Sequence, residues 1–138
     1  DVNKTPIVDD LRGYIAALAA RGLELPENAV VVAPASIEGG IAAMRRAWED
    51  GLRPTAVLVM SDVMAIGAIG AAGLLGLEVP ADLSVVGFDD IELARHVRPP
   101  LTTVRPRGSM RHEIPVLVDR ASPRRSSMAR NEASAACW

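Results

Sequence analysis

The sequence predicts an α/β fold in which a parallel sheet carries helices on both faces. Three short apolar segments, 29–33, 55–60 and 83–88, show no alternation of polar and apolar residues, which is typical of strands buried on both faces. Segments with helical periodicity lie between them, and strands that alternate with helices favour a parallel sheet with right-handed crossovers. Only 3% of the residues are aromatic although 49% are hydrophobic, so we expect a core of Ala, Val, Leu and Ile.

Helices are predicted on either side of the first strand. Residues 9–21 carry apolar side chains at helical spacing, and Gly22 is expected to end this helix. The first strand, 29–33, is flanked by prolines, and Ser36 is a candidate N-cap for the helix that follows. Gly51 closes that second helix.

The alternation then continues along the chain. After the strand 55–60, either Ser61 or Asp62 caps a third helix that runs to Gly76. The remaining expected elements are a strand at 83–88, a short helix at 91–97 and two strand-like segments, 101–104 and 114–118.

The charge of the chain changes character at Arg105. The chain has a net charge of −2, so it shows no overall nucleic-acid footprint. Residues 105–138 nevertheless hold seven Arg against three acidic residues, a net of +4. We therefore divide the chain into a globular domain, 1–105, and an atypical basic tail, 106–138, and we expect most of residues 119–138 to be disordered or loosely attached.

The composition also bears on cofactors and compartment. Cys137 is the single cysteine, and neither CxxC nor Cys/His metal spacing occurs, so we expect no disulfide framework, metal or cofactor. No apolar run reaches the roughly 18 residues that span a membrane, and no signal peptide is visible. We expect a cytoplasmic protein without a membrane partner.

A ligand site is expected at one edge of the sheet, because ligands of open parallel sheets bind beyond the carboxyl ends of the strands. Three segments answer this description, namely 33–36, 60–62 and 88–90. Each one ends an apolar strand with small, polar or acidic side chains.

Two pairs of polar residues at this edge each have two interpretations. Asp89 and Asp90 could each accept hydrogen bonds from ligand hydroxyls, or one of them could instead N-cap the helix at 91. Ser61 could donate to a ligand or cap the third helix, whereas Asp62 is well placed for the dipole of that helix.

An enzyme finds little support in the sequence, and we predict no catalytic residue. Gly67, Gly70, Gly73 and Gly76 recur at a spacing of three within a predicted helix, which favours close packing against another helix over a nucleotide loop. There is no phosphate loop, and Ser61 lacks a nucleophile elbow. His96 and His112 are isolated and are interpreted as surface or loop residues. A doubly wound enzyme remains a third hypothesis.

Residues 54–105 contain the segments PTAVLVMSDVMAIG, GLEVPADLSVVGFDD and PPLTTV, in this order and at suitable spacing. Through these segments the chain resembles the LacI/GalR family of transcriptional regulators. Weaker similarity extends back through Ser36–Gly40 to Gly13 and Tyr14. The tail does not follow the family's pattern, as a truncated or frame-shifted gene would produce, and we hypothesise that the chain is a fragment.

The resemblance implies the C-terminal lobe of a type I periplasmic-binding-protein-like fold, in which two lobes close on a small ligand. The family's ligand contacts fall on Ser61 and Asp89. The position of Ala35 often carries an aromatic residue in sugar-binding members, so a stacking platform is missing here. Asp10 stands where the family often has Arg, which removes a guanidinium clamp.

The function that the resemblance implies is effector sensing in a LacI-type, DNA-binding transcriptional regulator. The effector would be a sugar-like or nucleoside-like molecule, and operator DNA would be bound through a module absent from this chain. The alternative is a periplasmic sugar-binding protein of a transport system, which would need a signal peptide upstream.

The resemblance also implies a homodimer through the helix that follows Ser61. The small residues of this helix permit close approach of a second copy. The interface residues expected on this basis are Met64, Ala68, Ala71, Ala72 and Leu75.

Overall fold

A computed structural model describes residues 7–105 and 113–119, and its strands form one five-stranded sheet. The order across the sheet is β1-β5-β2-β3-β4. β2 is parallel to β3 and β3 to β4, whereas β5 lies antiparallel between β1 and β2. The strands are β1 (Val30–Pro34), β2 (Ala56–Val59), β3 (Ser84–Phe88), β4 (Thr102–Val104) and β5 (Glu113–Asp119).

The first four strands share one direction, as predicted, because β1 and β2 both run antiparallel to β5. The mixed character of the sheet comes from β5, which pairs Val32 with Pro115 on one side and Leu58 with Leu117 on the other. A segment of the predicted tail thus belongs to the sheet. Residues 106–112 and 120–138 lie outside the described part of the chain.

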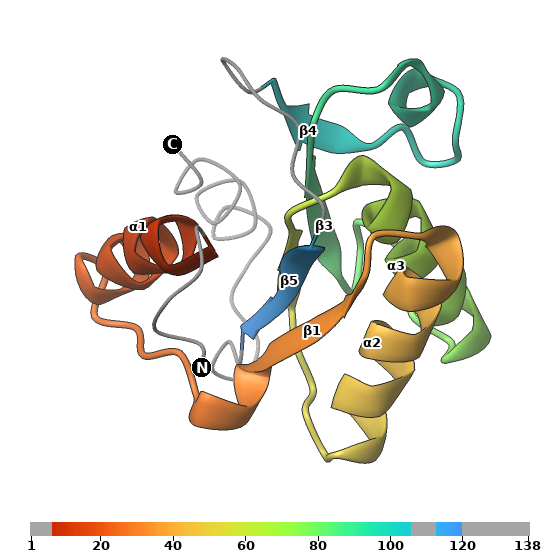
Figure 1. Cartoon of the computed structure of the whole chain (residues 1–138). Coiled ribbons are helices and arrows are strands. Elements are labelled where there is room, and N and C mark those ends of the chain that lie inside the picture. Colours follow the sequence, from red (N-terminus) through yellow and green to blue (C-terminus); the bar gives the residue numbers. More distant parts are fainter. Residues whose placement is uncertain (1–6, 106–112, 120–138) are drawn as a thin grey trace.

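Helices cover both faces of the sheet, which confirms the predicted α/β class. Helices α2 (Ile37–Glu49) and α3 (Asp62–Leu74) lie side by side on one face, and α1 (Ile7–Ala19) covers the other (Figure 1). Two short 3-10 helices, η2 (Glu27–Ala29) and η3 (Glu92–Arg95), complete the described elements. None of the described helices has the length and hydropathy required to cross a membrane.

The core is divided by the sheet into a larger and a smaller cluster. Successive residues of a strand point to opposite faces, so Val57 and Val59 of β2 join the larger cluster with α2 and α3. Leu58 and Met60 join the smaller cluster, against which Leu11 and Tyr14 of α1 pack. The continuous apolar pattern of this strand is therefore explained by burial on both faces.

Helices α2 and α3 cross at very close range because glycine lies at the crossing. A Cβ on Gly40 would overlap the backbone carbonyl of Met64, and one on Gly67 would overlap the carbonyl of Ile37. Of the regularly spaced glycines in α3, only Gly67 serves this packing, since Gly70 and Gly73 face open space.

Candidate functional site

The candidate site lies where β2 and β3 end. Ser61 is separated from β2 by one residue, and Asp89 directly follows β3. Because the two strands are parallel neighbours, their carboxyl ends lie at the same edge of the sheet. Ala35 follows β1 and is exposed, but β5 separates β1 from β2, so Ala35 lies two strand positions from β2.

A strained turn connects β3 to η3. Asp89 has a φ of 126° and Asp90 a φ of 55°. Residues other than Gly rarely adopt a backbone conformation with positive φ. Three consecutive N–H groups of this turn are satisfied from outside it. Asp89 N donates to Val104 O at 2.9 Å, Asp90 N to Thr103 Oγ1 at 3.2 Å and Ile91 N to Asp62 Oδ2 at 3.0 Å.

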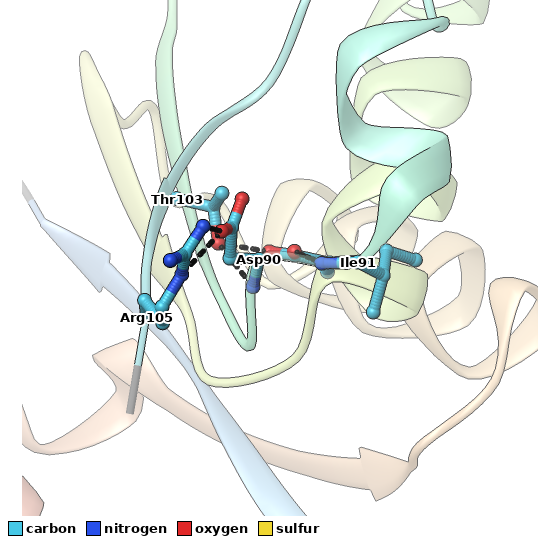
Figure 2. Close-up of polar contacts among 5 residues, drawn as sticks. Asp90, Ile91, Thr103 and Arg105 are labelled. Carbon is cyan, nitrogen blue, oxygen red and sulfur yellow. Dashed lines mark hydrogen bonds and ion pairs between the residues drawn. The ribbon is translucent and has the colours of Figure 1, made fainter. Parts of the chain in front are cut away.

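The carboxylate of Asp90 is held by Arg105, which directly follows β4 (Figure 2). Arg105 Nε lies 2.7 Å and Arg105 Nη2 2.6 Å from Asp90 Oδ2. The helix η3 begins after Ile91 without any side-chain cap. The interpretation of Asp90 as an N-cap is therefore wrong, because its carboxylate is engaged by a guanidinium instead.

The carboxylate of Asp89 has a different environment. It makes no hydrogen bond and no ion pair within the described residues, and it is exposed at the sheet edge. Desolvation by the surrounding protein raises the pKa of Asp89 above its usual range, and the charge of Asp62 raises it further. Asp89 can accept hydrogen bonds from a bound molecule without giving up an internal partner.

Ser61 is the N-cap residue of α3 by position but not by contact. Its side chain makes no capping hydrogen bond, and the residue is 4% exposed. By contrast, the side chain of Ser36 accepts from Gly39 N at 2.9 Å and caps α2, as predicted. Buried hydroxyl groups normally have a partner, so the Ser61 hydroxyl is a candidate donor or acceptor for a ligand.

Asp62 has a role that the sequence did not indicate. Instead of only facing the helix dipole, its fully buried carboxylate joins α3 to β4 and to the turn after β3. Thr103 and Arg105 were not predicted to lie at the site either. The polar Thr103 within a short predicted strand was the one available signal.

The remaining residues that the sequence analysis considered lie elsewhere in the fold or outside the described part of the chain. The backbone of Asp10 lies in α1, but its side chain is outside the described part of the structure. His96 is exposed, as expected, and His112 is not described. Among the described residues, no group of three or more His, Cys, Asp or Glu could hold a metal ion.

The predicted dimer contacts need a correction. Met64, Ala68, Ala71 and Ala72 are all 0% exposed, because they form the face of α3 that packs into the chain's own core. Side chains with no exposed surface cannot touch a second copy. Only Leu75, which is half-buried, retains surface for such a contact.

Comparison with known proteins gives the same family from sequence and from structure. Residues 2–109 match the model of the periplasmic binding protein-like domain. The ribose operon repressor of Escherichia coli is 43% identical over 103 residues, which are 75% of this chain and 31% of that protein. The chain thus spans about a third of the length of the curated relatives it matches.

Two solved structures show the same resemblance in three dimensions. A sugar-binding transcriptional regulator of the LacI family from Escherichia coli, complexed with phosphate, superposes with a TM-score of 0.70 and 34% identity over 74% of this chain and 37% of that one. A dimeric Lac repressor gives a TM-score of 0.50 and 44% identity over 51% of this chain and 26% of that one. The chain belongs to the periplasmic-binding-protein-like domain family, with the effector-binding region of LacI-type transcriptional regulators as its match.

Proposed function

We propose that this chain is the effector-sensing part of a LacI-type transcriptional regulator that acts in the cytoplasm. Its effector is a sugar-like or nucleoside-like molecule bound at the carboxyl ends of β2 and β3. Operator DNA is bound by a separate module of the regulator, outside this domain. Binding of the effector shifts a two-state equilibrium that couples the effector site to the DNA site.

The observation that carries this proposal is that Ser61 and Asp89 follow the ends of two neighbouring parallel strands. One is a carboxylate and the other a buried hydroxyl, and within the described residues neither side chain has a hydrogen-bond partner. A carboxylate can accept hydrogen bonds from two neighbouring hydroxyls, and a serine hydroxyl can donate or accept one. This combination suits the polyhydroxylated edge of a sugar or ribose ring.

The relatives favour a regulator over the periplasmic transport protein that shares its fold. The Escherichia coli relative is an operon repressor, and both solved structures are transcriptional regulators or repressors. The same relatives favour a binding role over an enzyme, since each of them is a regulator.

We further propose that the regulator is a homodimer that uses the solvent face of α3. This face is apolar although it is accessible. Leu74 is 85% exposed, Gly70 and Gly73 are exposed, and Val63 and Ile66 are half-buried. The face lies opposite the one that the sequence predicts, since the core already occupies that one. A dimeric Lac repressor among the structural neighbours supports a second copy as the occupant.

The effector site is tested by calorimetric titration of the 138-residue chain with D-ribose, other monosaccharides, cellobiose and adenosine. We expect at least one of them to bind, and D89N and S61A to weaken that binding. Loss of a hydrogen bond to a charged group costs about 1.5–3 kcal/mol, so D89N should lower the affinity by about tenfold or more. E92Q is the matched control, because Glu92 is an exposed acid on η3. Equal effects of D89N and E92Q would contradict the site.

The role in transcription is tested by reading the coding sequence upstream of the Asp1 codon. A helix-turn-helix followed by a second lobe supports a regulator. A secretory signal peptide leading into that lobe would replace the regulator with a transport binding protein.

A further inference from the structure

Asp62 is an unusual residue for the interior of this domain. It is 0% exposed, and no Lys or Arg of the described residues forms an ion pair with it. Burial of a carboxylate without a cation is costly unless hydrogen bonds satisfy its oxygens. Here each oxygen has one donor. Oδ1 accepts from Thr103 Oγ1 at 2.6 Å, and Oδ2 accepts from Ile91 N at 3.0 Å.

The strand β3 leaves room for this carboxylate. A Cβ at Gly87 would overlap Asp62 Oδ1 and would lie 2.9 Å from Leu101 Cδ2. Glycine at this position thus allows the carboxylate to sit against the backbone of β3. Any larger residue there would displace either the carboxylate or the strand.

Thr103 extends the arrangement to the strained turn. Its hydroxyl donates to Asp62 and accepts from Asp90 N, so one hydroxyl links α3, β4 and the turn after β3. Figure 2 shows Thr103, which lies in β4, and Arg105, which directly follows β4, both next to Asp90. Residues with positive φ persist only where the surroundings determine their conformation. The hydrogen bonds donated by Asp90 N and Ile91 N fix the backbone conformation of this turn.

We infer that Asp62 and Thr103 position Asp89 for the ligand. Their hydrogen bonds fix the backbone of the turn that carries the Asp89 side chain. We call these two side chains the latch. This inference rests on the proposed function of Asp89 as a ligand contact. Asp62 and Thr103 are positioning residues and touch no ligand themselves.

The first arm of the test needs no ligand. Amide hydrogen exchange in the wild-type chain should show the N–H groups of Asp90 and Ile91 protected to the same degree as the strand β3. T103V and D62N should speed exchange at these two amides by about tenfold or more, because T103V removes two hydrogen bonds, one of them to the Asp62 carboxylate, and D62N removes the charged acceptor. T103S, which keeps the hydroxyl, should retain the protection, and so should T102V, since Thr102 is exposed and its side chain has no partner among the described residues.

The second arm reports on Asp89 itself. In T103V the turn is released, so the desolvation of Asp89 should lessen and its pKa, followed by NMR titration of its carboxyl group, should fall towards the usual range. T103S and T102V should leave that pKa raised. If Thr103 only stabilises the fold, T103V would lower the melting temperature of the chain without changing the pKa of Asp89.

The third arm uses whichever compound of the sugar and nucleoside panel binds best. T103V should weaken its binding by about tenfold, and T103S should restore it. Two results would contradict the latch. One is a wild-type chain in which the amides of Asp90 and Ile91 are unprotected. The other is a T103V variant that keeps both this protection and the raised pKa of Asp89. If the wild type binds no compound of the panel, the proposed effector class fails, while the first two arms still decide whether the latch holds Asp89. If T103V does not fold, the wild-type exchange and T103S decide.

Discussion

At the scale of single residues, the two adjacent aspartates after β3 have opposite environments. Asp90 faces Arg105 and forms an ion pair with it, whereas Asp89 pairs with no cation of the described residues. A protein can tolerate an unpaired, partly desolvated carboxylate at a binding site at some cost in stability.

That cost predicts the effect of D89N on unfolding. The pKa of Asp89 is raised in the folded chain, so folding favours its protonated form. Its contribution to stability is present below the usual aspartate pKa of about 3.9 and is lost as pH rises through the raised value. At neutral pH, D89N should therefore melt at a higher temperature than the wild type, and the difference should vanish in acid. Asparagine also tolerates positive φ.

Thermal unfolding followed across this pH range checks the sign. D90N is the control, because it breaks the pair with Arg105 and should not stabilise the chain. A D89N variant less stable than the wild type at neutral pH would contradict the argument.

At the scale of the elements, α3 has two apolar faces for two reasons. One face is packed against α2 and the sheet, where Gly40 and Gly67 let the backbones of α2 and α3 approach each other. The other faces solvent and includes the exposed Leu74. Sequence periodicity cannot separate these faces, because the helix is apolar all round.

Alanine substitution distinguishes the glycines of the two faces. In G40A the new methyl group meets the carbonyl of Met64, so α2 and α3 must separate, and we expect a loss of about 1–3 kcal/mol in the free energy of unfolding. In G70A nothing lies within 4 Å of the new Cβ, and the better helix propensity of alanine should add about 0.5–1 kcal/mol. Urea unfolding of both variants measures the difference. Equal midpoints would rule out the close crossing.

At the scale of the whole molecule, the sheet depends on a strand from near the end of the chain. β5 is the strand that connects β1 to β2, and β1 has no other strand partner in the described sheet. The site at the ends of β2 and β3 lies on the far side of β5 from β1. The geometry of the Asp89 turn is thus set by β3, β4 and α3, whereas Ala35 lies at the end of a different strand, β1.

Self-association belongs to the same scale. If the solvent face of α3 is the dimer interface, L74E should convert the dimer to a monomer, because an unpaired charge would be buried there. Sedimentation velocity measures the change. L93E is the control, since Leu93 is also an exposed leucine but lies on η3, and it should leave the dimer intact. A wild-type chain that sediments as a monomer at all concentrations would contradict the proposed interface.

The sequence by itself determined the class of fold and the order of the main helices and strands before β5, and it predicted the sheet edge of the candidate site. Apolar runs and helical periodicity depend on neighbours along the chain, so they can be recognised without coordinates. The cap at Ser36 is local in the same way, because its partner is only three residues away.

Only the tertiary structure decided which polar residues of that edge are already engaged. Asp62 and Thr103 are 41 residues apart, Asp62 and Ile91 29, and Asp90 and Arg105 15. No local pattern signals such pairings, because the folded sheet and helix bring these residues together. The same reason applies to the antiparallel insertion of β5 and to the buried face of α3, where burial is a property of packing between elements and not of periodicity within one.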